Sequence, residues 1–156
     1  MNCAKLFVLL ILFIAASARP IYRSVSATTL RATVTQNTAP APSFITAEQL
    51  KAKLGRKEPV TVIDVRDTES YLNSNRIKDS IYVKERRLAY RLTMPPLKDV
   101  SRDRDIVTYC ACPHDEASIR AAQTLLASGF KHVYVLQGGW QMWVKVNGQT
   151  SPRPRA

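Results

Sequence analysis

Two cysteines one residue apart, Cys110 and Cys112, are the residues whose type and spacing most directly suggest chemistry. A thiolate is a strong nucleophile, and it is favoured where loop N–H groups and the start of a helix point at the sulfur. The apolar run 106–109 ends at Cys110, a short polar loop follows, and a helical pattern over residues 118–128 stops at Gly129. This order predicts an activated thiol at a strand end. The alternative is that two small apolar side chains merely close a buried strand.

The N-terminal residues 1–18 have the pattern of an export signal. Lys5 supplies a charged start, residues 6–15 are continuously apolar, and Ala-Ser-Ala at 16–18 has the form that signal peptidase cuts. The apolar run is shorter than the roughly 20 residues of a spanning helix. We therefore expect a periplasmic or secreted protein, with an uncleaved membrane anchor as the alternative. Cleavage would remove Cys3 and leave two cysteines, too few for a disulfide-stapled scaffold, which favours a chemical use for them.

The formal net charge of +11 is unevenly distributed. Arg19, Arg23 and Arg31 lie in a segment with no acid before Glu48, and the C-terminal residues are basic as well. No interleaving of aromatic and basic residues indicates a nucleic-acid partner. The charge suits the attraction of small anions or of anionic surfaces. We expect a monomer that needs no cofactor and no metal.

Composition divides the rest of the chain into three parts. Residues 19–43 are rich in Thr, Ala, Ser and Pro without periodicity, which predicts a flexible linker. Residues 44–148 contain the periodic patterns and form the predicted folded domain. Residues 149–156 contain two prolines and are predicted to be an unstructured tail.

Strand and helix patterns alternate within residues 44–148. A capping box at Thr46 and Gln49 opens the first helix, and Asp67 can cap the second. The predicted strands cover residues 60–65, 81–83, 105–109 and 132–136, and further helical patterns cover 85–93, 118–128 and 138–144. Such alternation predicts an α/β fold with parallel strands and helices on both faces. The binding crevice of such sheets lies at the carboxyl ends of the strands, where Cys110 is expected.

At this point the chain resembles the rhodanese-like family. Four segments match in the family's order: Val62–Arg66, ending in Asp-x-Arg; Tyr71 with Arg76–Val83; Ile106–Cys110; and Gly129–Trp143, with its Gly-Gly-Trp. The resemblance covers roughly residues 44–148 and implies a five-stranded parallel sheet with helices on both sides. It also implies sulfurtransferase activity. A cysteine would take sulfane sulfur from a donor such as thiosulfate and pass it, as a persulfide, to cyanide or a thiol.

The resemblance leaves two candidates for the nucleophile. Counting forward along the strand gives Cys110, and counting back from Ser118 gives Cys112. We favour Cys110, because Tyr-Cys at the strand end fixes where the thiol emerges. Cys112 is then the alternative nucleophile, or a resolving thiol that attacks the persulfide, releases sulfide and leaves a disulfide.

The substrate-binding loop lacks the family's usual arginine. Its expected members are Ala111, Pro113, His114, Asp115, Glu116, Ala117 and Ser118. Carboxylates turned inward would repel an anionic donor, by about 4 kcal/mol for two charges about 4 Å apart at an effective dielectric of 20. We expect them instead to point outward and complement the helix dipole.

Three residues outside the loop could supply supporting charge: Asp64, Arg66 and Arg120. Arg66 and Arg120 could provide the missing positive charge. The simpler interpretation of Asp64 and Arg66 is a structural ion pair, and that of Trp140 and Trp143 is the core.

The leading hypothesis is a rhodanese-type sulfurtransferase with a persulfide on Cys110. The main alternative is a non-catalytic rhodanese-like module that binds a partner or senses redox state through Cys110 and Cys112. Metal capture by both cysteines and His114 is disfavoured, because no fourth ligand is evident. Phosphatase action is disfavoured too, because no arginine occupies the loop to clamp phosphate.

Overall fold

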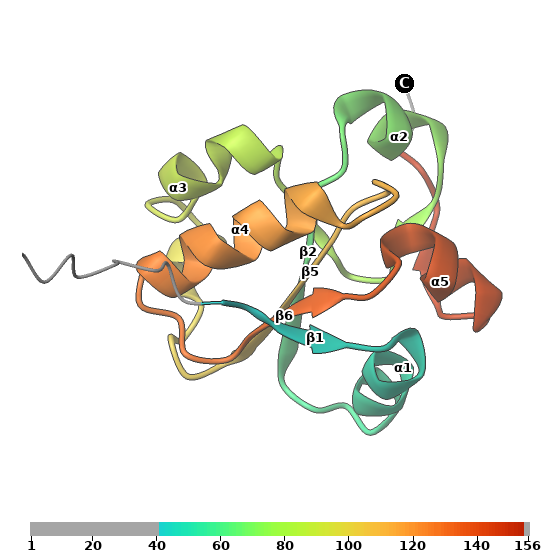
Figure 1. Ribbon diagram of the computed structural model, residues 1–156, viewed down its shortest axis with the longest axis horizontal. Helices are drawn as coiled ribbons and strands as arrows, with labels where there is room; N and C mark the ends of the chain where they lie inside the picture. The colour runs from blue at the N-terminus through green and yellow to red at the C-terminus, as the bar shows by residue number, and fades with distance from the viewer. Residues whose placement is uncertain (1–40, 155–156) are drawn as a thin grey trace, which may run out of the picture. The chain divides into compact units, whose positions relative to one another are not determined.

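The computed structural model describes residues 41–154, and Figure 1 shows their arrangement. Its main sheet has five strands: β1 (Ser43–Ile45), β2 (Val60–Asp64), β4 (Ile81–Tyr82), β5 (Asp105–Tyr109) and β6 (Val133–Leu136). The strand order is β1-β6-β5-β2-β4, and every neighbouring pair is parallel. The predicted α/β fold with a five-stranded parallel sheet is confirmed, and β5 lies at its centre.

The helices are short, and the first two begin at the caps that the sequence predicts. They are α1 (Ala47–Gly55), α2 (Thr68–Asn73), α3 (Leu88–Arg91), α4 (Glu116–Ala127) and α5 (Gly139–Lys145), with 3-10 turns η1 (Glu85–Arg87) and η2 (Leu97–Asp99). Thr46 and Gln49 form the predicted capping box of α1, and Asp67 caps α2 by accepting from Ser70 N. The predicted helix over residues 85–93 is instead divided into η1 and α3.

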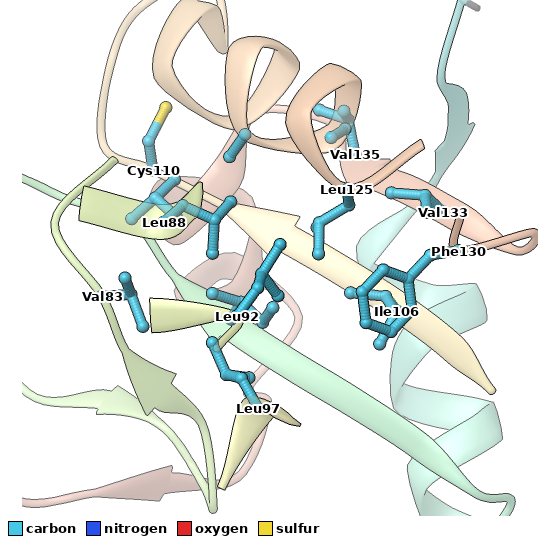
Figure 2. Close-up of a cluster of buried hydrophobic side chains, with 14 residues drawn as sticks. Val83, Leu88, Leu92, Leu97, Ile106, Cys110, Leu125, Phe130, Val133 and Val135 are labelled. Atoms are coloured by element: carbon cyan, nitrogen blue, oxygen red, sulfur yellow. The ribbon is translucent and has the colours of Figure 1, made fainter. Parts of the chain in front are cut away.

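Two apolar cores lie on opposite faces of the sheet. Helices α3 and α4 cover one face, and α1 and α5 cover the other (Figure 1). Residues of β5 alternate between them, because side chains along a strand point to opposite faces: Ile106 and Cys110 join the first core, Val107 and Tyr109 the second. The first core is shown in Figure 2, where Cys110 lies at one end of the cluster, beside Leu88.

The C-terminal segment corrects the predicted domain boundary. Residues from 149 on were predicted to be an unstructured tail, but β7 (Thr150–Ser151) pairs antiparallel with β3 (Arg76–Ile77). The buried Trp143 indole N–H also donates to Gln149 O at 3.1 Å. The sequence gives no sign of this pairing, because two-residue strands carry no periodicity.

The predicted export signal at residues 1–18, and all but the last three residues of the predicted linker, lie outside the described residues. Within residues 41–154, no helix is both long enough and apolar enough to cross a membrane.

Candidate active site

Cys110 follows directly after β5, at the carboxyl edge of the sheet, and its side chain is fully buried. It points toward α4, on the same side as Thr108 and Ile106, two and four residues earlier. Its Sγ accepts a hydrogen bond from Cys112 N at 3.3 Å and another from Ser118 Oγ at 3.5 Å. A neutral or ionised sulfur is therefore held between the loop and the first turn of α4.

Cys112 is only partly buried, and it lines a cavity of about 200 Å³. Burial raises the pKa of its thiol, and the adjacent Cys110 thiol raises it further, while the backbone N–H of Ala117 opposes both. Both cysteines are free thiols. Of the two thiols that the sequence singles out, Cys112 is therefore the one that lines a cavity, whereas Cys110 is fully buried.

The cavity beside Cys112 is rich in basic side chains. Its lining residues are Val65, Arg66, Asp67, Lys84, Glu85, Arg86, Ala111, Cys112, Ala117 and Arg120. Arg66 and Arg120, the two candidates for supporting positive charge, both line it, and Arg120 Nε lies 3.5 Å from Glu85 Oε1. The sequence analysis did not identify Lys84 and Arg86 as site residues. They follow β4, so their signal was their place at a strand's carboxyl end, the same signal that Cys110 carries.

Asp64 and Arg66 form a buried, multiply hydrogen-bonded ion pair, which confirms the structural interpretation. Arg66 Nη2 donates to Asp64 Oδ2 at 2.7 Å, and both side chains are fully buried. Tyr109 Oη donates to the same carboxylate oxygen at 2.7 Å, and Arg66 Nη1 donates to Ser74 Oγ at 2.6 Å. The guanidinium also stacks 4.9 Å from the centroid of Trp140. Its charge is thus largely compensated before any substrate arrives.

The Gly-Gly-Trp segment at the start of α5 holds the cysteine loop in place. Trp140 N donates to Cys110 O at 2.9 Å, and Gln141 Nε2 donates to Ala111 O at 3.1 Å. A Cβ on Gly139 would lie 2.1 Å from Cys110 O, so only glycine allows this approach, and its φ is +47°. The sequence placed this segment in the family's closing signature without indicating its contact with the loop.

Asp115 does not point outward, so that expectation was wrong. It takes a left-handed conformation with φ 56°, and its Oδ2 accepts from Gly138 N at 2.8 Å. Its Oδ1 is buried without a hydrogen-bond partner, and burial raises the pKa of this carboxyl. Glu116 is exposed in the first turn of α4, as expected. Neither carboxylate lines the cavity, so neither opposes an anion there.

The remaining loop residues are of two kinds: some are exposed to solvent, and the others line the cavity or contact Cys110. Pro113 and His114 are exposed and do not line the cavity, whereas Ala111 and Ala117 do. Ser118 is buried and donates to Cys110 Sγ. No three His, Cys, Asp or Glu side chains of residues 41–154 come together as metal ligands would, so the two cysteines and His114 do not converge.

Comparison with known proteins decides the family. The rhodanese-like domain model matches residues 46–146. The chain belongs to the rhodanese-like family. A relative named thiosulfate sulfurtransferase GlpE, from Pseudomonas syringae pv. syringae (strain B728a), is 30% identical over 93 residues, which cover 60% of this chain and 80% of the relative.

Solved structures of rhodanese-like domains support the same assignment. The Alr3790 protein from Anabaena sp. is 32% identical, with a TM-score of 0.60 over 69% of this chain and 81% of that one. A thiosulfate sulfurtransferase from Pseudomonas aeruginosa shares the fold, with a TM-score of 0.60 over 71% of this chain and 20% of that one, at 21% identity. This rhodanese-like domain is thus related to sulfurtransferases.

Proposed function

We propose that this rhodanese-like protein is a sulfurtransferase that moves sulfane sulfur from a donor such as thiosulfate to cyanide or a thiol. The observation that carries the proposal is the opening of the Cys112 thiol into a basic cavity at the carboxyl edge of the sheet. The cavity's four lining cations, Arg66, Lys84, Arg86 and Arg120, outnumber its two lining carboxylates, Asp67 and Glu85, which favours an anionic donor. The 30% identity to a thiosulfate sulfurtransferase supports the same class of reaction.

The sulfur carrier in this proposal is Cys112, the alternative nucleophile of the sequence analysis. The sequence favoured Cys110, but that side chain is fully buried and does not line the cavity. A nucleophile must reach the donor, and only Cys112 combines exposure with a helix start, through Ala117 N–H. Cys110 then lies directly behind it and accepts from Cys112 N.

The reaction conserves electrons overall. The Cys112 thiolate attacks the outer sulfur of thiosulfate, the S–S bond of the donor breaks, and sulfite leaves with the electron pair. An acceptor thiolate or cyanide then attacks the outer sulfur of the persulfide, and the Cys112 thiolate is released. Ala117 N–H, at the start of α4, favours that thiolate, although burial raises the pKa of the Cys112 thiol overall.

Mass spectrometry after incubation with thiosulfate tests this assignment. We expect one added sulfur on Cys112 in the wild type and in Cys110→Ser, and none in Cys112→Ser, whose turnover with cyanide should be abolished. Serine is the matched change at both positions, because it keeps the size and removes the thiol. Sulfur on Cys110, or full turnover in Cys112→Ser, would return the role to Cys110. No added sulfur on either would contradict the enzyme.

A redox module is the second candidate, and the proximity of the two thiols favours it. Cys112 N donates to Cys110 Sγ at 3.3 Å, and the Cys110 thiol adds to the effect of burial in raising the pKa of the Cys112 thiol, so the two thiols are neighbours. Exchange with an external disulfide, which is reduced to two thiols, would join Cys110 and Cys112 and remove two free thiols; a dithiol reductant would restore them. Stoichiometric loss of two thiols without turnover of thiosulfate or a persulfide donor distinguishes this function from sulfur transfer.

A further inference from the structure

A second and larger cavity adjoins the one at Cys112. Its volume is about 380 Å³, and it is lined by Thr68, Tyr82, Val83, Lys84, Arg87 and Arg91. Lys84 lines both cavities, and Asp67 of the first is followed in the chain by Thr68 of the second. The two cavities therefore meet along Lys84 and the start of α2.

Three cations face this second cavity, and no carboxylate lines it. Arg87, the last residue of η1, directly precedes α3, and Arg91 ends α3. The two are four residues apart and line one cavity, and like charges at this spacing repel each other. Among residues 41–154, neither they nor Lys84 forms an ion pair with a carboxylate. An anion bound here would relieve that repulsion.

The cavity is also lined by two hydroxyl side chains, Thr68 and Tyr82, which are held in place. Tyr82 Oη donates to Thr68 Oγ1 at 3.3 Å, which leaves the threonine hydroxyl hydrogen to donate to a ligand. Tyr82 also stacks on Tyr71, with ring centroids 3.7 Å apart, so the two hydroxyls are preorganised. Carboxylate recognition needs donors of this kind beside guanidinium groups.

Cavity size indicates what the second site adds. The cavity at Cys112 is below the roughly 300 Å³ at which pockets for larger organic ligands begin, so it suits a small inorganic donor. The neighbouring cavity is within that range. A ligand occupying both would place sulfur at Cys112 and anionic groups several bonds away, at Arg87 and Arg91.

We propose that the cavity at Arg87 and Arg91 is a subsite for the carboxylates of a low-molecular-weight thiol or persulfide whose sulfur reacts at Cys112. This deepens the proposed function and rests on it for the reaction, but not for the binding. In the forward step, the Cys112 thiolate attacks the outer sulfur of the persulfide. The ligand's S–S bond breaks, its thiolate leaves, and Cys112 becomes the persulfide, with no net oxidation.

Binding is tested first, with S-methylglutathione as an unreactive probe, by calorimetry on the full chain. We expect binding that weakens as salt increases, and at least a tenfold weaker Kd in Arg87→Gln/Arg91→Gln, as the loss of charge-assisted hydrogen bonds implies. Arg104→Gln is the matched control, because Arg104 is exposed and precedes β5 at the other end of the sheet. Blocking the probe's carboxylates as methyl esters should weaken its binding to the wild type similarly.

Turnover is measured second, with glutathione persulfide and thiosulfate compared on the same variants. The ratio of kcat/KM for glutathione persulfide to that for thiosulfate should fall about tenfold in Arg87→Gln/Arg91→Gln, mainly through KM, and stay constant in Arg104→Gln. If the double variant fails to fold, the single variant Arg87→Gln repeats the test, because the Arg87 side chain is exposed.

The outcomes separate the two proposals. Undetectable probe binding to the wild type at millimolar concentration, or equal binding by wild type and double variant, overturns the subsite. Binding that depends on Arg87 and Arg91, without sulfur transfer from any donor, supports the subsite and contradicts the sulfurtransferase.

Discussion

Replacing Gly139 with alanine should both destabilise the protein and disable the cysteine loop. Gly139 has a φ of +47°, which costs a residue with a Cβ about 1–2 kcal/mol. The new Cβ would lie 2.1 Å from Cys110 O, a backbone atom that cannot rotate away, and overpacking of this kind costs about 1–3 kcal/mol more. The combined loss of about 2–5 kcal/mol should lower Tm by roughly 4 °C for each kcal/mol.

The loop should suffer beyond what the stability loss explains. Moving Cys110 O away from the clash also breaks its hydrogen bond from Trp140 N, so Cys112 loses its position at the cavity. We therefore expect Gly139→Ala to show a large drop in kcat for sulfur transfer, and an altered alkylation rate at Cys112, well below its Tm.

Gly129→Ala is the matched control for this experiment. Its φ is +87°, but nothing lies within 4 Å of the added Cβ, so it carries the backbone cost without the clash. Thermal unfolding and turnover should show a smaller Tm loss and normal kcat. If Gly139→Ala and Gly129→Ala lose equal stability and Gly139→Ala keeps its kcat, the contact between α5 and the cysteine loop does not position the site.

Three further predictions concern the side chains of Tyr109, Asp115 and Cys112. Tyr109→Phe removes the hydroxyl that donates to Asp64 Oδ2 and should lower the unfolding free energy in urea by about 1–3 kcal/mol; an unchanged midpoint would contradict the network. Burial raises the pKa of Asp115, so its contribution to stability is complete below its ordinary value of about 3.9 and is lost as pH rises through the folded pKa. Asp115→Asn cannot ionise, so relative to it the wild type should lose stability in urea melts from acidic to neutral pH, and a constant difference would refute this. The raised pKa of Cys112 predicts that alkylation by iodoacetamide still accelerates above about pH 8.5, and that Cys110→Ala shifts the profile to lower pH; a plateau at neutral pH would disprove it.

Local chemistry was sufficient to predict most of the fold. Thr46 and Asp67 cap their helices because a side-chain oxygen next to free N–H groups acts within one turn, whatever the rest of the chain does. The apolar run of β5 is an equally local signal, because a strand that is buried on both faces of a sheet needs apolar residues at successive positions. The pairing of β7 with β3 joins segments more than 70 residues apart and has no such signal.

The sequence-based prediction of the site failed where a side chain is positioned by a residue far away along the chain. Asp115 was expected to face solvent because its neighbours indicate only a helix start, whereas Gly138, 23 residues later, supplies the N–H that turns it inward. Lys84 and Arg86 carry one local signal, their place after a strand, and this signal does not tell which side chains they meet. They line the same cavity as Cys112 because β4 lies beside β2 at the same edge of the sheet.

The sequence by itself determined the class of sheet, the family resemblance and the pair of thiols at the carboxyl end of the central strand. These depend on residue type, periodicity and the order of motifs, which need no third dimension. Which of the two thiols is buried and which lines a cavity depends on the tertiary structure, since exposure depends on everything packed around a side chain. The Cys110 sulfur is buried between the loop and the first turn of α4, and Cys112, two residues later on a loop held by α5, lines the basic cavity.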